Sequence, residues 1–227
     1  MTDTDGYVLS YHDELGRVLV STKEYNIGDI VLKEKSLIVY NSLIELVSKS
    51  LELSSNDREL LYDMYHRDFQ LDNLPIFEEC RDFLVQSFNS IKSEISIDNK
   101  NLLSEISIDD VYKLIAISNF NCHNFVGSNT GYAEVTNPTD SMNKRSALFY
   151  FGSKLSHSCE PNCSYTSKVI DGDVLMYRAI KKISEGDILS FSYINPRLCT
   201  EDRRAVLMRE KDFFCKWYGL IYFLMLI

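Results

Sequence analysis

The sequence predicts an α+β fold in which short strands enclose one helical insertion. Three observations support this prediction. Short β-rich runs fill the first forty residues, helical spacing of apolar residues follows, and short strands return after Asn121. At 227 residues the chain is long enough for one large domain. We therefore predict a single domain over 1–227, divided into an N-terminal β part (1–41), a helical insert (42–120), a core (121–200) and a tail (201–227).

The N-terminal part is predicted to be β because β-favouring runs alternate with turns. Tyr7–Tyr11 and Val18–Ser21 flank a turn at Asp13–Gly16. A second turn at Asn26–Asp29 precedes Ile30–Tyr40, where apolar and β-branched residues interleave with charged ones.

The insert is predicted to be helical because its apolar residues recur every three or four positions, as in Leu43, Leu46 and Val47. Ser54 and Asn56 are candidate N-caps, and Ile108–Asp110 opens a further helix. The same pattern covers Phe77–Ile91, and the polar stretch Ser93–Ser104 is predicted to be a loop.

The second half is predicted to return to strands and turns, with a final charged helix at Glu201–Lys211. Asp171–Asp173 has the composition of a hairpin turn, and Gly127–Lys144 that of a loop. The predicted strands are Ala147–Phe151, Cys163–Lys168, Val174–Ala179 and Ile188–Ile194.

Composition excludes several classes of protein. The formal net charge of −9 argues against direct nucleic-acid binding and fits either a basic, Lys-rich partner or a soluble surface. Six cysteines are too few for a disulfide scaffold. The N-terminus lacks the features of a signal peptide, and even the apolar tail Trp217–Ile227 is shorter than a membrane span, so we expect no membrane partner. These features predict a reducing compartment, the cytoplasm or the nucleus.

The segment Ser156–Cys163 is the strongest candidate site. It contains His157, Cys159 and Cys163, whose side chains suit metal ligation or a Cys/His nucleophile. Taken alone, the segment is better explained by a tight turn with buried thiols. About 23 residues later, Glu185–Asp187 leads into a run that ends at Tyr193.

Together these segments resemble the SET domain, a family of protein lysine methyltransferases. The resemblance is closest to the SET-and-MYND group and covers nearly the whole chain. The segments that carry it are Gly16–Ser21, Gly28–Leu32, Lys113–Ala116, Asn121–Phe125, Leu155–Cys163, Tyr177–Ile183, Gly186–Ile194 and Thr200–Leu207.

The resemblance implies a mostly-β core of small curved sheets, with the His157 segment and the Tyr193 strand passing each other in a knot-like crossing. S-adenosylmethionine would bind on one side of the crossing, and a lysine of a histone or another protein would enter from the other. Tyr193 would be the catalytic residue. The cofactor would contact Gly16, Arg17, Asn121, Ser156, His157 and Tyr193. Phe149, Phe191 and Phe213 would line the substrate channel.

The chain departs from the family pattern in three places. Ser156 replaces the usual asparagine, and no cysteine-rich MYND zinc module is present. The C-terminal cysteine cluster keeps Cys215 but has Trp217 where a second cysteine is expected. Cys159 and Cys215 are the implied zinc ligands, and two ligands are too few for a closed zinc site.

Three hypotheses follow from the sequence. The first is an S-adenosylmethionine-dependent protein-lysine N-methyltransferase. The second is a SET-fold binding module that holds a peptide or the cofactor without turnover, and the third is a zinc-stabilised structural domain. Ser156 and the missing thiols favour the binding module, whereas the spacing from His157 to Tyr193 favours the enzyme.

Overall fold

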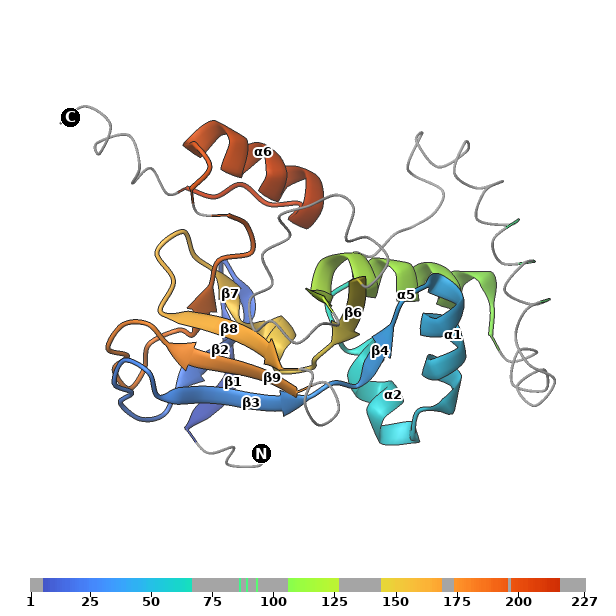
Figure 1. Ribbon diagram of the computed structural model, residues 1–227, viewed down its shortest axis with the longest axis horizontal. Coiled ribbons are helices and arrows are strands. Elements are labelled where there is room, and N and C mark those ends of the chain that lie inside the picture. Colours follow the sequence, from blue (N-terminus) through green and yellow to red (C-terminus); the bar gives the residue numbers. More distant parts are fainter. Residues whose placement is uncertain are drawn as a thin grey trace. The chain divides into compact units, whose positions relative to one another are not determined.

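The computed structural model describes residues 6–66, 106–126, 144–168, 174–195 and 197–216, together with Gln86, Asn89 and Ser93 in helical conformation. Several predictions fall outside these residues: the rest of Phe77–Ile91, the loop stretches after Ser93 and from Gly127 to Asn143, the turn Asp171–Asp173 and the tail Trp217–Ile227. The described chain forms two compact units, one from residues up to Lys35 and from Lys154 onward, the other from Ser36 to Ser153. Figure 1 labels their helices and strands.

The first unit contains three small sheets and one helix. β1 (Tyr7–His12) and β2 (Gly16–Ser21) form an antiparallel hairpin. Gly16 closes its turn with a φ of 71°, a left-handed conformation that favours glycine. The remaining elements are β3 (Ile30–Lys35), β7 (Ser156–His157), β8 (Cys163–Lys168), β9 (Val174–Ala179), β10 (Ser190–Phe191) and α6 (Thr200–Lys211).

A three-stranded sheet in the order β3-β9-β8 forms the largest sheet of this unit, and all its pairs are antiparallel. β8 and β9 have the bounds that the sequence predicts, and Lys168 pairs with Val174 across the connection. The buried apolar residues of the unit come from β2, β3, β9 and the stretch just before β10. They include Val18, Leu19, Leu32, Leu175, Tyr177, Ala179 and Leu189.

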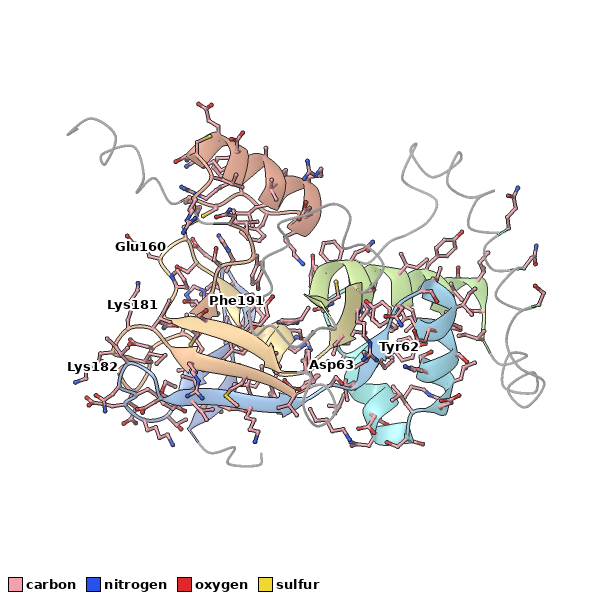
Figure 2. The ribbon with its side chains drawn as sticks, viewed as in Figure 1. Tyr62, Asp63, Glu160, Lys181, Lys182 and Phe191 are labelled. Carbon is pink, nitrogen blue, oxygen red and sulfur yellow. The ribbon has the colours of Figure 1, made fainter. Side chains whose placement is uncertain are left out.

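The second unit packs helices against a three-stranded antiparallel sheet in the order β4-β6-β5. Its elements are β4 (Ile38–Tyr40), α1 (Leu43–Glu52), α2 (Ser55–Tyr62), α5 (Ile108–Asn121), β5 (His123–Val126) and β6 (Lys144–Leu148). The apolar helical spacing builds one core. It contains Ile38, Tyr40, Leu46, Val47, Leu51, Leu61, Met64, Ile106, Val111, Leu114, Ile117 and Leu148. At the end of α2, the Tyr150 hydroxyl donates to the Asp63 carboxylate at 2.8 Å. Figure 2 labels Asp63.

The α+β fold class is confirmed: the described residues form four small sheets and four α-helices. The β-rich run Ile30–Tyr40 forms two strands, β3 and β4, which belong to different sheets. The predicted strand Ala147–Phe151 is wrong in its bounds, because β6 ends at Leu148 and the chain then turns into a 3-10 helix at Gly152–Lys154. Within the described residues, no helix is long and apolar enough to cross a bilayer.

The two candidate N-caps of α2 have different outcomes. Ser54 is the N-cap, since its hydroxyl accepts from the Asp57 N–H at 3.1 Å, whereas Asn56 lies inside the helix and is exposed. Ser54→Ala is expected to lower the free energy of unfolding by about 1 kcal/mol because one helix N–H loses its acceptor. Asn56→Ala should change it by less than about 0.5 kcal/mol. Denaturant unfolding of both variants measures the difference, and equal losses would contradict the assignment.

Candidate functional site

The strand that leads to Tyr193 lies directly beside the His157 segment. β10 and β7 pair in parallel, with Phe191 opposite His157. The Ser156 N–H donates to the Leu189 carbonyl at 3.2 Å, and the Ser158 N–H donates to the Phe191 carbonyl at 3.0 Å. Two segments far apart in the sequence thus meet as neighbouring strands.

The side chain of Asn162 holds this pair together. Its Oδ1 accepts from the Ser190 N–H at 2.8 Å and from the Ser190 hydroxyl at 3.2 Å. Its Nδ2 donates to the Ile188 carbonyl at 2.9 Å. The Asn162 side chain therefore bonds backbone groups of Ile188 and Ser190 as a neighbouring strand would. Sequence reasoning gave this residue no role, although it lies in the segment Leu155–Cys163 that carries the family resemblance.

Tyr193 is fixed at both its backbone and its hydroxyl. The hydroxyl donates to the Leu155 carbonyl at 2.6 Å, and the backbone N–H donates to His157 Nδ1 at 3.2 Å. Burial raises the pKa of Tyr193 well above its ordinary value. The hydroxyl is therefore neutral at physiological pH, and with its proton engaged the oxygen has lone pairs left to accept.

The predicted strand Ile188–Ile194 is shorter in the structure, and the reason lies in the same contacts. The Tyr193 N–H donates to an imidazole, and the Ser192 hydroxyl donates to the Ile194 carbonyl at 2.8 Å. The backbone beyond Phe191 is therefore held by side chains instead of a strand ladder.

Aromatic rings surround Tyr193. The ring centroid of Phe191 lies 4.8 Å from that of Tyr193, and those of His157 and Phe213 lie at 5.3 Å and 6.3 Å. Phe213, from the segment after α6, also lies 5.6 Å from the His157 ring. The ring centroids of Phe191 and Tyr177 are 5.2 Å apart, and Figure 2 labels Phe191 within this unit. The structure thus brings together two of the three predicted channel residues.

Other predicted residues are less closely connected to Tyr193. Gly16 and Arg17 begin β2. The Leu19 carbonyl of this strand accepts from the Leu189 N–H at 2.8 Å, one residue before β10. Asn121 and Phe149 belong to the second unit, so their place in the site stays a prediction. Both hydrogen bonds from the Asn121 amide stay within that unit, to the Ile117 and Tyr65 carbonyls, each at 2.7 Å.

His157 is neutral and its tautomer follows from its contacts. Burial, and secondarily the positive Arg203 guanidinium, lower the pKa of His157 to about 4. Nδ1 accepts from the Tyr193 N–H, so in the neutral ring the proton resides on Nε2. Nε2 lies 3.3 Å from Cys159 Sγ and donates toward it.

The buried Arg203 is a second residue that sequence reasoning missed. Its side chain is 1% exposed and donates to the Leu198 carbonyl at 2.8 Å and to Thr200 Oγ1 at 3.1 Å. Arg203 lies in α6, within the segment Thr200–Leu207 that resembles the family. Taken alone, a charged residue in a helix is typical of an exposed face, so the sequence gives no sign of its burial.

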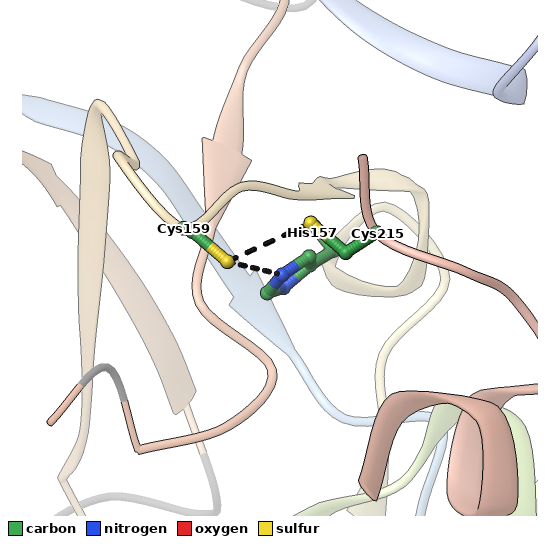
Figure 3. Close-up of side chains that lie close together, drawn as sticks. All are labelled: His157, Cys159 and Cys215. Carbon is green, nitrogen blue, oxygen red and sulfur yellow. Dashed lines mark hydrogen bonds between the residues drawn. The ribbon is translucent and has the colours of Figure 1, made fainter. Parts of the chain in front are cut away.

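The two predicted zinc ligands do lie together: Cys159 Sγ and Cys215 Sγ are 3.6 Å apart (Figure 3). With His157 they form a cluster whose ligand atoms all lie within 4.8 Å of one another. However, the Nε2 of the tautomer described above carries its proton and offers no lone pair to a metal. The described residues therefore supply two ligands, and they do not fit a closed zinc site.

The buried histidine predicts a pH dependence of stability. Because the pKa of His157 is about 4 when folded and about 6.5 when unfolded, the unfolded chain binds more protons between those values. Above pH 6.5, His157 should therefore leave the free energy of unfolding unchanged. Between pH 6.5 and pH 4 it should lower that free energy progressively, by at most about 3 kcal/mol.

Denaturant unfolding between pH 4 and pH 7 in the presence of a chelator measures the effect. The His157→Gln variant should show a shallower slope than the parent, since the difference between the two profiles cancels the other titrating groups. Parallel profiles would contradict a buried neutral His157.

Comparison with known proteins decides the family. Residues 16–194 match the family model described as "SET domain". The chain belongs to the SET-domain family. Its sequence relatives include "Histone-lysine N-methyltransferase SMYD3" of Homo sapiens, 25% identical over 75% of this chain and 36% of that protein. The Mus musculus protein of that name is 38% identical over 28% of this chain and 14% of its own length.

A putative SET domain-containing protein of Acanthamoeba polyphaga mimivirus is 25% identical over 87% of this chain and 74% of its own length. The chain thus spans about a third or less of the two SMYD3 proteins, but most of the viral one. The resemblance to a SET-and-MYND methyltransferase is confirmed.

Solved SET-domain structures share the fold. "Structure of Rubisco LSMT bound to AdoMet" superposes with a TM-score of 0.56 at 13% identity, over 95% of this chain and 53% of that one. "Crystal structure of the SET domain of LSMT bound to Lysine and AdoHcy" gives a TM-score of 0.54 at 13% identity, over 95% and 54%. At this identity the likeness shows the SET fold alone.

Proposed function

We propose that this SET-domain protein is an S-adenosylmethionine-dependent methyltransferase acting on the side-chain amine of lysine in a protein substrate. The observation that carries the proposal is Tyr193, a neutral hydroxyl held by the Leu155 carbonyl at the β7–β10 crossing and enclosed by aromatic rings. SET-domain membership and methyltransferase relatives support the same class of reaction.

The residues around Tyr193 fit the proposed cofactor. A sulfonium cation favours aromatic faces and oxygen lone pairs, and Tyr193 offers both. Gly16, Arg17, Ser156 and His157 would hold the remaining parts, with the backbone at Ser156 already ordered by its strand bond to Leu189. When bound, S-adenosylmethionine supplies an electrophilic methyl group.

The contribution of the chain is positioning. Methyl transfer needs a neutral amine aligned with the methyl–sulfur bond, and no covalent enzyme intermediate. The Tyr193 oxygen can accept from the amine, and the rings of Phe191 and Phe213, which lie beside Tyr193, would exclude water from the bound amine. Burial between aromatic rings lowers the pKa of a lysine ammonium and so favours the reactive form.

The substrate is proposed from charge. A net charge of −9 favours a basic segment such as a Lys-rich tail of a histone or another protein. The same surface disfavours nucleic acid as a direct partner. Reducing conditions in the cytoplasm or nucleus suit the described cysteines, which form no disulfide with one another.

Calorimetric titration of the full chain with S-adenosylmethionine tests the cofactor pocket, with S-adenosylhomocysteine as a second ligand. Saturable binding of both is expected, and absence of binding would refute the proposal. Transfer of labelled methyl to mixed histones and to a cell extract then separates the enzyme from the alternative, a SET-fold binding module. Binding without any transfer would favour that module, which the serine at position 156 already makes a specific alternative.

A further inference from the structure

The thiols of Cys159 and Cys215 form a close pair built from distant parts of the chain. Cys159 lies in the loop after β7, and Cys215 lies in the segment after α6, 56 positions later. Their sulfur atoms are 3.6 Å apart. Figure 3 draws the two side chains with a dashed line between their sulfurs. Both residues are half-buried, so each keeps part of its surface in contact with solvent.

The pair has no complete metal site to serve among the described residues. A closed zinc site needs about four ligands. The third candidate, His157, keeps its Nδ1 lone pair on the Tyr193 N–H, which leaves the proton on Nε2. Two neighbouring thiols can instead be oxidised to a disulfide. The sulfur–sulfur distance in a disulfide is about 2.05 Å.

We propose that Cys159 and Cys215 form a reversible disulfide that fastens the segment after α6 to the loop after β7. The sulfurs must approach by about 1.5 Å to reach bonding distance. Side-chain rotation at Cys215 can supply this movement, since the residue lies beyond the end of α6 in a stretch without regular structure.

The oxidant is a peroxide. Burial, and secondarily the neighbouring Cys215, raise the pKa of Cys159 to about 11, so we assign the attacking thiolate to Cys215. This thiolate attacks a peroxide oxygen and breaks the O–O bond, which gives a sulfenic acid and water after protonation. The sulfur of the second cysteine then displaces hydroxide from the sulfenic sulfur, and its proton leaves with that hydroxide as water. Two thiols lose two electrons and hydrogen peroxide becomes two waters. A dithiol such as dithiothreitol reverses the change by thiol–disulfide exchange.

The position of the disulfide would couple oxidation to the site. Phe213 lies two residues before Cys215, and its ring contacts those of His157 and Tyr193. In the reduced chain, the Arg204 Nε donates to the Cys215 carbonyl at 2.9 Å and holds the same segment non-covalently. Oxidation would make this attachment covalent.

The test is the disulfide itself, in the full chain without any methyl donor. The reduced protein is treated with chelator and hydrogen peroxide, alkylated with iodoacetamide and digested with trypsin under non-reducing conditions. The expected product joins the peptide Asp212–Lys216 to Leu155–Lys168. Fragmentation at the Glu160–Pro161 bond distinguishes Cys159 from Cys163 in the second peptide.

Two variants and one condition control the assignment. Cys215→Ser should abolish the joined peptide, whereas Cys199→Ser, which removes an exposed thiol at the start of α6, should leave it unchanged. Oxidation in concentrated guanidinium chloride should reduce its yield at least about tenfold, because the fold brings the thiols together.

The proposal is overturned if folded protein yields Cys159 as alkylated thiol or sulfinic acid without the joined peptide. An equal yield in folded and denatured chains would overturn it too. Either failure leaves the methyltransferase proposal untouched, since no substrate or cofactor enters the assay.

Discussion

Replacing Tyr193 with phenylalanine is expected to lower methyl transfer about 100-fold while leaving the fold intact. The variant keeps the aromatic contacts to Phe191 and His157 but loses the hydroxyl that the Leu155 carbonyl holds at 2.6 Å. The hydroxyl is the group proposed to hold the amine beside the methyl. Its loss should therefore appear in kcat more than in cofactor affinity.

The measurement is labelled-methyl transfer by the purified variant, combined with calorimetric titration of the cofactor. Tyr165→Phe is the matched control, because its ring also packs against Phe191, at 5.6 Å, yet its hydroxyl has no part in the proposed chemistry. The control should keep activity within about twofold of the parent. If Tyr193→Phe is as active as the parent, the hydroxyl has no catalytic role and the proposal for this residue fails.

Replacing Asn162 with alanine is expected to lower the free energy of unfolding by about 3 kcal/mol. The substitution removes two acceptor contacts to Ser190 and the donor contact to the Ile188 carbonyl. It leaves the Ser190 N–H, in a half-buried strand, without its partner. Because β10 leads directly to Tyr193, methyl transfer should fall together with stability.

Denaturant unfolding of two further variants assigns the loss. Asn162→Asp keeps the oxygen that accepts from the Ser190 N–H but sets a second acceptor oxygen against the Ile188 carbonyl, so its loss of stability reports on the donor position alone. Asn195→Ala removes an exposed turn contact, Asn195 Oδ1 to the Arg197 N–H at 3.0 Å, and should cost less than about 0.5 kcal/mol. If Asn162→Ala lowers the free energy of unfolding no more than Asn195→Ala does, the Asn162 hydrogen bonds do not stabilise the β7–β10 pair.

Local patterns predicted the elements best where the local signal is strong. β8 and β9 appear with their predicted bounds, because two β-rich runs flank a hairpin-type sequence. The helix predicted from Ile108 begins there, with Ser107 and Asp110 forming a capping box. These features depend on contacts between residues close in sequence, which a pattern can register.

The candidate site was only partly accessible to the same reasoning. Ser156, His157 and Tyr193 came from the spacing of a family resemblance, and the structure places all three at the β7–β10 crossing. Asn162 and Arg203 were missed, because their partners are backbone atoms or buried groups that only the folded chain brings near. Composition classifies both residue types as ordinary surface residues.

The sequence by itself determined the α+β class, the order of its elements and the family. Hydrophobic period, turn chemistry and a spaced motif are all written along the chain. Only the tertiary structure decided that the strand to Tyr193 ends at Phe191 and that the His157 imidazole accepts from the Tyr193 N–H. It also placed the Cys159 and Cys215 sulfurs 3.6 Å apart across 56 positions. Both outcomes depend on long-range contacts, whose partners are set by packing and not by spacing along the chain.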